Sequence, residues 1–141
     1  MPRASVALIR LAFAHLIVGA SCGAIVLAHK GWGGAPWAWR LLPAHIECLS
    51  IGWTLQFILG VAYWMLPKWE TPPMRGHPGP VWAAVLALNL GVLAVLAGGA
   101  IGRDAPGAAD ALAAGGRAME LGAFACFATN AWPRIKRFGA G

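Results

Sequence analysis

Residues 43–67 read PAHIECLSIGWTLQFILGVAYWMLP, a mostly apolar run with one acidic side chain, Glu47, and one imidazole, His45. A helix rises about 1.5 Å per residue, so roughly 20 apolar residues cross the roughly 30 Å hydrocarbon layer of a bilayer. Pro67 ends the run because proline cannot continue a helix. With the residues just before it, this run predicts a membrane-spanning helix at 40–66.

Three further apolar segments of similar length lie on either side of this run, at residues 5–28, 80–101 and 112–132. Stretches rich in glycine and proline separate the four segments. The hydrocarbon layer offers the backbone no hydrogen-bond partners, so each segment is expected to be helical. The sequence thus predicts an all-α integral membrane protein, a bundle of four transmembrane helices in a single domain covering residues 1–141.

The composition argues against a soluble protein. Of the 141 residues, 59% are hydrophobic and 11% are charged, whereas soluble domains carry about 25% charged residues. The net charge of +6 comes from basic residues scattered between apolar runs. This scatter favours the lipid bilayer over nucleic acid as a partner. No phosphate loop, HExxH motif or Ser-His-Asp set indicates a hydrolase.

The basic residues also predict an orientation, because cytoplasmic loops carry an excess of Lys and Arg. With four spans, both termini share one side with the loop at 67–79, and the apolar run that ends near residue 28 is expected to be a retained span. We therefore expect both termini in the cytoplasm and a multi-pass protein of the bacterial inner membrane. The inner side would hold Arg3, Arg10, Lys68, Arg75, Arg134, Lys136 and Arg137, and the outer side Lys30, Arg40, Arg103 and Arg117.

Small residues spaced four apart occur in three of the spans, a pattern that lets helix backbones approach closely. Each pair predicts a close contact between helices. With short loops and no soluble domain, such packing suits a homo-oligomer or a subunit of a larger membrane complex. The pairs are Gly19 with Gly23, Gly98 with Gly102, and Ala118 with Gly122.

Ionisable side chains inside the spans are functional hypotheses, because charges are costly in hydrocarbon. Glu47 and Glu120 have similar depths on the second and fourth spans. They are expected to be neutral or paired in a shared buried polar network, with a proton relay as one interpretation. Arg117 lies near a helix end and is expected to extend into the interface. The set within the spans is His15, His45, Glu47 and Glu120.

The second span is expected to be polar on two sides. At 100° per residue, two lines of polar or small residues lie roughly opposite each other along this helix. Such a helix should lie centrally in the bundle or face a second copy of the chain. The first line holds His45, Cys48, Gly52, Gln56 and Tyr63, and the second holds Glu47, Ser50 and Thr54.

The stretches 43–53 and 56–67 resemble one particular haem-carrying helix. They are similar to the second helix of subunit I in haem–copper oxidases and nitric oxide reductases, and to the related NnrS-type membrane proteins. In that pattern a histidine near the outer end is an axial ligand of a b-type haem, and an ending like G-V-A-Y-x-x-x-P follows at the inner face. His45 matches the ligand position, and residues 60–67 match the ending. The stretch from Arg10 to Gly19 is loosely similar to the preceding helix.

The resemblance implies haem b as a cofactor, with His45 as one axial ligand. A second ligand would come from a facing helix, and small residues would make room for the macrocycle. The alternatives for this ligand are His15, His29, Met119, or His45 of a second copy. A metal site of Cys22 and Cys48 with His45 is a separate alternative. The candidate cofactor-binding residues are therefore His45, His15, Gly52, Gln56 and Met119, with His45 and His15 as candidate metal ligands.

The family's catalytic centre needs six histidines, and this chain has four. Reduction of oxygen or nitric oxide by this chain alone is therefore not expected, and an enzymatic role is less favoured than a carrier role. The leading hypothesis is a cytochrome b-like membrane protein acting in electron transfer or in the handling of haem or a gas. The alternatives are a non-catalytic accessory or scaffold subunit of a respiratory or photosynthetic complex, and a small transporter.

Overall fold

The computed structural model describes residues 1–102 and 104–135. Every regular element in these residues is helical, as the sequence predicts. The elements are α1 (Arg3–Trp32), η1 (Pro36–Leu41), α2 (Leu42–Glu47), η2 (Cys48–Leu55), α3 (Gln56–Met65), α4 (Gly79–Ile101), α5 (Pro106–Ala131) and η3 (Trp132–Arg134). The elements from η1 to α3 follow one another without a break and form one helical rod, Pro36–Met65, called the second rod below.

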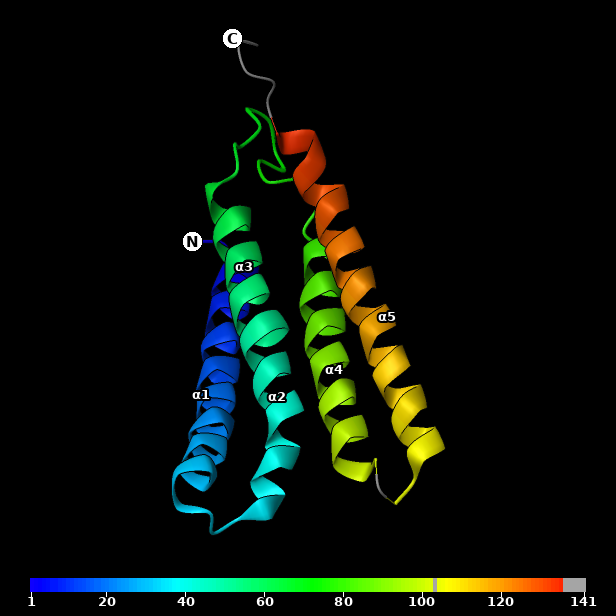
Figure 1. Ribbon diagram of the computed structural model, residues 1–141. Coiled ribbons are helices and arrows are strands. Elements are labelled where there is room, and N and C mark those ends of the chain that lie inside the picture. The colour runs from blue at the N-terminus through cyan, green and yellow to red at the C-terminus, as the bar shows by residue number, and fades with distance from the viewer. Residues whose placement is uncertain (103, 136–141) are drawn as a thin grey trace.

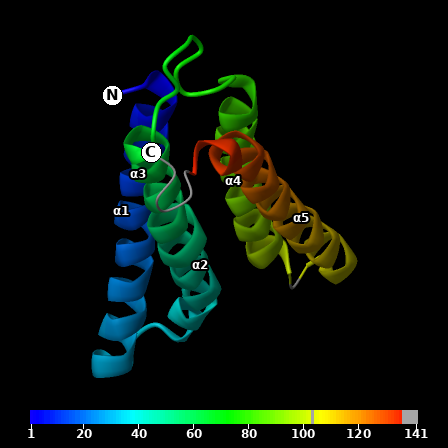
Figure 2. The ribbon, with the colours of Figure 1, turned by 90° about the horizontal axis from the view of Figure 1, so that it is seen from above.

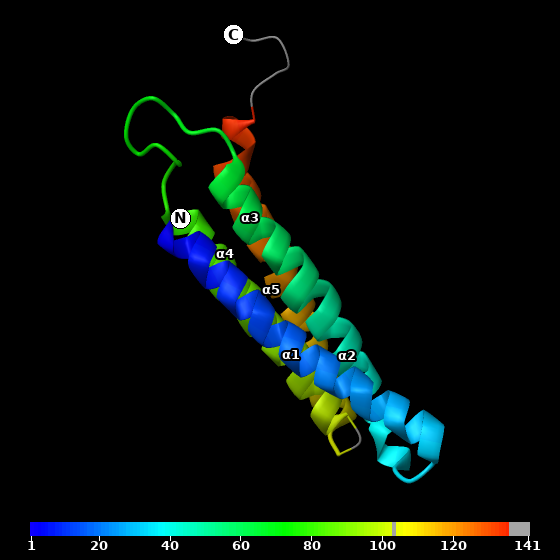
Figure 3. The same cartoon turned by 90° about the vertical axis from the view of Figure 1, so that its left-hand side faces the viewer.

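The helices form two hairpins (Figure 1). In the first hairpin, α1 packs along the second rod, and in the second, α4 packs along α5. Seen from above, the two pairs lie beside each other (Figure 2), and the view onto α1 shows the second rod running alongside it (Figure 3). The hairpins contact each other mainly through α4, which touches α1, α2 and η2. The chain start and the end of α5 lie at the same end of the bundle (Figure 1).

Three helical segments of the described chain are long and apolar enough to cross a membrane: α1, the second rod and α4. The chain therefore has the character of a membrane protein. The 26 residues of α5 are long enough, but this helix does not meet the same requirement for hydropathy and charge. Its sequence includes Arg117, Glu120 and Asn130, which lower its mean hydropathy. Length and hydropathy therefore support α1, the second rod and α4 as spans.

Glycines mark the closest contacts within the hairpins. A Cβ added at Gly19 would lie 2.8 Å from Leu49, and one at Gly98 would lie 2.8 Å from the Ala109 carbonyl oxygen. These two positions are close contacts, as the small-residue pattern predicts. Gly122 is different, because a Cβ there would meet nothing within 4 Å. Gly122 therefore makes no close contact within the described chain and lies on the open face of α5.

The second rod changes its winding in the middle. Residues Cys48–Leu55 form a π-helix, in which the hydrogen bond spans five residues instead of four. The Thr54 hydroxyl also donates to the Leu49 carbonyl, five residues earlier, at 2.8 Å. Each π turn holds about one residue more than an α turn. Over eight residues, the side chains that follow the π segment are therefore rotated about the helix axis by roughly 0.4 of a turn, compared with a continuous α-helix.

This rotation corrects the predicted faces of the second rod. Gln56, expected on the line of His45, instead points to α4, where its amide donates to Asn89 at 3.5 Å. The His45 ring packs against α1, where a Cβ on Gly23 would lie 2.5 Å from it. The rule of 100° per residue failed here because it assumes uniform α winding. The π segment aligns Gln56 with Glu47 on the side of the second hairpin.

An arginine cap closes the end of the bundle at the loop between α3 and α4. Arg134 is 1% exposed, and its guanidinium donates to the carbonyls of Tyr63, Leu66 and Pro67 at 3.2, 2.9 and 3.0 Å. These carbonyls belong to a helix end, where four acceptors lack partners within the helix. Arg75 from the loop donates to the Trp64 carbonyl at 2.8 Å.

Burial lowers the pKa of Arg134, and the positive charge of Arg75 lowers it further. The guanidinium nevertheless stays protonated at neutral pH because an arginine titrates far above it. Asn130 on α5 donates to the carbonyls of Arg75 and His77 at 3.1 and 3.0 Å, and so fastens the loop to α5. The apolar core lies at this same end, where side chains of α1, α3, α4 and α5 form one buried cluster.

Candidate functional site

Two carboxylates from different hairpins share one arginine. Glu47 ends α2 and is 3% exposed, and Glu120 lies in the middle of α5 and is 4% exposed. Arg117 contacts Glu47 Oε2 at 2.6 Å and Glu120 Oε2 at 3.1 Å. Gly91 of α4 makes room for this arrangement, because a Cβ there would lie 2.8 Å from Glu120 Cγ. We call Glu47, Arg117 and Glu120 the carboxylate–arginine triad.

The position of Arg117 differs from its expected role. The sequence assigned this residue to the membrane interface alone, but it bridges the two buried carboxylates while 54% of its side chain stays exposed. The spacing of Arg117 and Glu120, three residues apart on one helix, is a signal that could have revealed the pair. The contact with Glu47 had no such signal, because it depends on how the two hairpins meet.

The triad has unused hydrogen-bonding capacity. Oε1 of Glu47 and Oε1 of Glu120 are buried and have no hydrogen-bond partner. With both carboxylates ionised, the triad would carry one net negative charge away from water, which is costly. A single bound proton would neutralise the triad and would add a donor for an unpartnered oxygen. The arrangement can therefore hold one proton between two carboxyl groups.

Gln56 and Asn89 make a second polar contact between the hairpins. Gln56 is fully buried, and its Oε1 also lacks a partner. The Asn89 amide in turn donates a hydrogen bond to the Val85 carbonyl of its own helix at 2.7 Å. The interface between the hairpins therefore has two polar contacts, the carboxylate–arginine triad and the Gln56–Asn89 pair. Each contact includes at least one buried oxygen without a hydrogen-bond partner.

His45 lies on the other side of the second rod, against α1. Its Nδ1 is 2.8 Å from the Gly19 carbonyl oxygen. A carbonyl only accepts hydrogen bonds, so the ring donates from Nδ1, and Nε2 of the neutral imidazole carries the free lone pair. The Nδ1–Cε1 edge of the ring is the part nearest to Gly23.

His15 has the same kind of partner but a different place. Its Nδ1 lies 2.9 Å from the Leu11 carbonyl oxygen, and its ring packs against Gly52, where a Cβ would lie 2.6 Å from Cγ. The carbonyls that hold the two rings, at Leu11 and Gly19, are eight residues apart, or about 12 Å along α1. The structure therefore does not bring His15 and His45 to opposite sides of one iron, and the ring of His15 fills the space at Gly52.

Other candidate ligands are also engaged or distant. The Ala35 N–H donates to His29 Nδ1 at 3.1 Å, and the His29 ring packs edge-on against Trp39. This use of Nδ1 fixes the loop after α1. Met119 is half-buried on α5, which packs along α4, whereas the His45 ring faces α1. Among the described residues, neither side chain forms a hydrogen bond with His45.

The cysteines do not form a metal site with His45. Cys22, Cys48 and Cys126 are free thiols, and in residues 1–102 and 104–135 no three or more His, Cys, Asp or Glu side chains gather to hold a metal ion. The alternative of a metal site at Cys22, Cys48 and His45 is therefore not supported.

His45 also lines a groove between α1 and the start of the second rod. This groove has a volume of about 240 Å³ and is open to the outside of the bundle. A cation and an aromatic ring lie at one end of it, and aliphatic side chains form the rest. We call it the His45 groove, and its lining residues are Gly23, Val26, Leu27, Lys30, Trp39, Leu42 and His45.

No family model, curated protein or solved structure matches this chain.

Proposed function

We propose that this chain is a four-span membrane protein that binds haem b through His45. The haem would lie in the His45 groove, and His45 of a second copy would provide the other axial ligand. A haem in this position would supply one-electron transfer or the binding of a diatomic gas. The protein would thus act as an electron carrier or in haem or gas handling in the bacterial inner membrane, with both termini in the cytoplasm.

The single observation that carries this proposal is the hydrogen bond from His45 Nδ1 to the Gly19 carbonyl, at 2.8 Å. Metal-bound histidines generally donate their other ring N–H to a carbonyl or carboxylate, which fixes the tautomer and the ring direction. Here the accepting carbonyl belongs to the neighbouring helix α1, so the ring is held before any ligand binds. The free lone pair on Nε2 is then available for iron.

The surroundings of His45 fit the amphiphilic shape of haem. Val26, Leu27 and Leu42 offer an apolar wall, and Lys30 places a cation at the end of the groove nearest the α1–η1 turn. An ammonium group near the interface is a suitable partner for haem propionates. Trp39 adds an aromatic ring at the same end.

A second copy is proposed because, in the part of the chain that the structure describes, no candidate second ligand lies beside His45. The carbonyls that hold the His15 and His45 rings are about 12 Å apart along α1, His29 accepts a hydrogen bond from the loop, and Met119 belongs to the other hairpin. The His45 groove opens to the outside, so a two-fold axis beside it would let His45 of each copy hold one shared haem. In such a dimer the ligand set is symmetric.

The fourth span is part of the proposal. Although α5 is less hydropathic than the other segments, its Glu120 and Asn130 are buried against other elements and paired with Arg117 and with the loop. A transmembrane helix tolerates polar groups that face the bundle interior and have partners. Reporter fusions after residues 34, 78, 105 and 135 test this topology, and the first and third should report the side opposite to the second and fourth.

Absorption spectroscopy of the detergent-solubilised protein tests haem binding. Protein from haem-replete cells should show a Soret band, with one haem per two chains and the low-spin spectrum of two nitrogen ligands. His45→Ala should lose the band, and added imidazole should restore it, because imidazole can occupy the space of the missing ring. Such a rescue separates loss of the ligand from misfolding.

The matched control is His77→Ala, which removes an exposed imidazole from the loop and should leave the spectrum unchanged. His15→Ala should also keep the Soret band, although it opens a gap beside Gly52. A haem-free protein, or an unchanged spectrum in His45→Ala, would overturn the proposal. The accessory-subunit alternative would then be favoured, and it expects His45→Ala to weaken only co-purification with a partner.

A further inference from the structure

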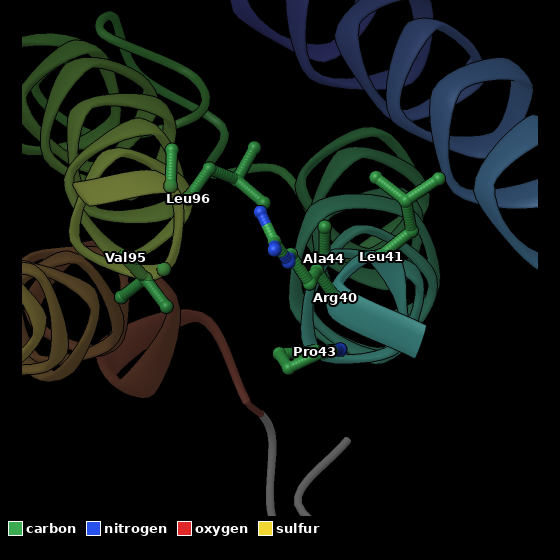
Figure 4. Close-up of a pocket in the computed structure, with 8 residues that line it drawn as sticks. Arg40, Leu41, Pro43, Ala44, Val95 and Leu96 are labelled. Atoms are coloured by element: carbon green, nitrogen blue, oxygen red, sulfur yellow. The ribbon is translucent and has the colours of Figure 1, made fainter. Parts of the chain in front are cut away.

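A second cavity lies at the open end of the bundle, between the two hairpins. It has a volume of about 160 Å³, and its walls come from the second rod and from the last turns of α4 (Figure 4). Its lining is mostly aliphatic: Leu41, Pro43 and Ala44 on one side, and Val95, Leu96, Gly99 and Ala100 on the other. In Figure 4 the Arg40 side chain lies between the two helices, with Leu96 across from it. We call this space the Arg40 pocket.

The mouth of the Arg40 pocket carries two opposite charges. An adjoining space of about 480 Å³ shares Arg40, Pro43, Gly99 and Ala100 with the pocket, and it is also lined by Asp104. Within residues 1–102 and 104–135, neither Arg40 nor Asp104 forms an ion pair or a side-chain hydrogen bond. A guanidinium and a carboxylate therefore flank the same opening without neutralising each other.

From this geometry we infer that the Arg40 pocket binds a phospholipid whose headgroup combines a phosphate with a primary ammonium. The phosphate would accept hydrogen bonds from Arg40, the ammonium would donate to Asp104, and part of one acyl chain would enter the aliphatic space. This inference does not depend on haem binding, because none of its residues lines the His45 groove.

The size and the position of the pocket favour a lipid. An apolar cavity of about 150 Å³ accommodates a molecule the size of benzene, so several methylene groups of an acyl chain fit here. Arg40 lies at the end of a membrane-length rod, near Trp37 and Trp39, and interfacial tryptophans mark the headgroup level. A guanidinium at this level can donate charge-assisted hydrogen bonds to a lipid phosphate. The carboxylate at the mouth selects against a purely anionic headgroup.

Native mass spectrometry can test the inference with the whole chain. The protein is released from micelles that contain equal amounts of phosphatidylethanolamine, phosphatidylglycerol and phosphatidylcholine. The expected result is a retained phosphatidylethanolamine adduct. Arg40→Gln should reduce it by about tenfold, the effect of a lost charge-assisted hydrogen bond. Asp104→Asn should remove the preference over phosphatidylglycerol.

Gly99→Leu is the sharpest variant, because a Cβ at Gly99 meets nothing within 4 Å and the leucine would fill the pocket without disturbing the fold. It should abolish the retained adduct. Gly122→Leu is the matched control, since a Cβ at Gly122 also meets nothing, but on the open face of α5. It should retain the adduct of the unaltered chain.

Equal retention of all three lipids, with no effect of Gly99→Leu, would mean that the adducts are non-specific lipid from the protein surface. This result would overturn the inference. A preference for phosphatidylglycerol that Asp104→Asn does not change would also overturn it. Soluble glycerophosphoethanolamine, which has no acyl chains, should not compete with the adduct, and full competition would contradict the role of the apolar pocket.

Discussion

The two sides of the second rod differ in how completely they are packed. Toward α1, imidazole rings fit against glycines, and both His15 and His45 have a backbone carbonyl as a partner. Toward the second hairpin, Glu47 and Gln56 are buried, and each has one unpartnered oxygen. The first side is a tightly fitted contact between two helices. The second side can still bind a proton or a water molecule at its unpartnered oxygens. We therefore expect pH-dependent behaviour on that side.

Gly23→Val gives the largest expected effect. A Cβ at this position would lie 2.5 Å from the His45 ring, so the helices must separate or the ring must leave Gly19. We expect a loss of about 3 kcal/mol in the free energy of unfolding, the upper part of the range for overpacking. Thermal unfolding in detergent, followed by circular dichroism, measures it. Gly31→Val is the matched control on α1, because a Cβ at Gly31 meets nothing.

Arg117→Met should have the next largest effect on stability. It leaves Glu47 and Glu120 buried without their shared cation, which costs about 3–5 kcal/mol for a fully buried pair. Because 54% of the Arg117 side chain is exposed, we expect about 2 kcal/mol here. Protonated carboxyls no longer need the cation, so the destabilisation should diminish as the pH falls. Unfolding measured across pH would contradict this account if the deficit stayed constant.

Adding Glu47→Gln and Glu120→Gln to Arg117→Met should recover most of the lost stability, because the variant then buries no carboxylate. A triple variant as unstable as Arg117→Met alone would show that the arginine acts through packing. The comparison separates charge from side-chain volume in the triad.

Glu120→Gln alone should change stability by less than about 1 kcal/mol, because an amide can replace a carboxyl that shares a proton. Its main effect should be spectroscopic. The infrared carbonyl band of a protonated carboxyl, recognised by its shift in D₂O, should be present in the unaltered protein at neutral pH and absent from this variant. Glu70→Gln, in the exposed loop, is the control and should keep the band.

Gln56→Leu should have the smallest effect. The side chain is fully buried, its Oε1 is unpartnered, and its one contact with Asn89 is long at 3.5 Å. Loss of so weak a hydrogen bond is nearly balanced by removal of an unsatisfied oxygen, so we expect a change below about 1 kcal/mol in either direction. A larger loss would indicate that Gln56 has a partner, such as an ordered water.

The positions of the helices followed from the sequence. Segments expected at 5–28 and 80–101 are the helices Arg3–Trp32 and Gly79–Ile101, because uninterrupted apolar runs and prolines mark their limits. The rod Pro36–Met65 also agrees closely with the expected 40–66. The segment expected at 112–132 begins earlier, at Pro106, since alanine and glycine there continue the helix despite low hydropathy.

The site itself was less predictable. The positions of Gln56 and Glu47 relative to each other depend on the π winding between them, which the residue types at Cys48–Leu55 do not reveal. The role of Arg134 was also missed, because a basic residue after a span usually indicates orientation. Its buried position depends on free carbonyls at the end of a helix about 70 residues away in the chain, and only the folded arrangement brings the two together.

The arginine cap gives the bundle a fixed pivot. Arg134 and Asn130 join the end of α5 to the second rod and its loop, at the same end as the shared apolar core. Nearer the middle of the bundle, Arg117 and Glu47 form an ion pair across the hairpins at 2.6 Å. A movement of the hairpins about the capped end would be largest at the Arg40 pocket, and it would strain the ion pair between Arg117 and Glu47.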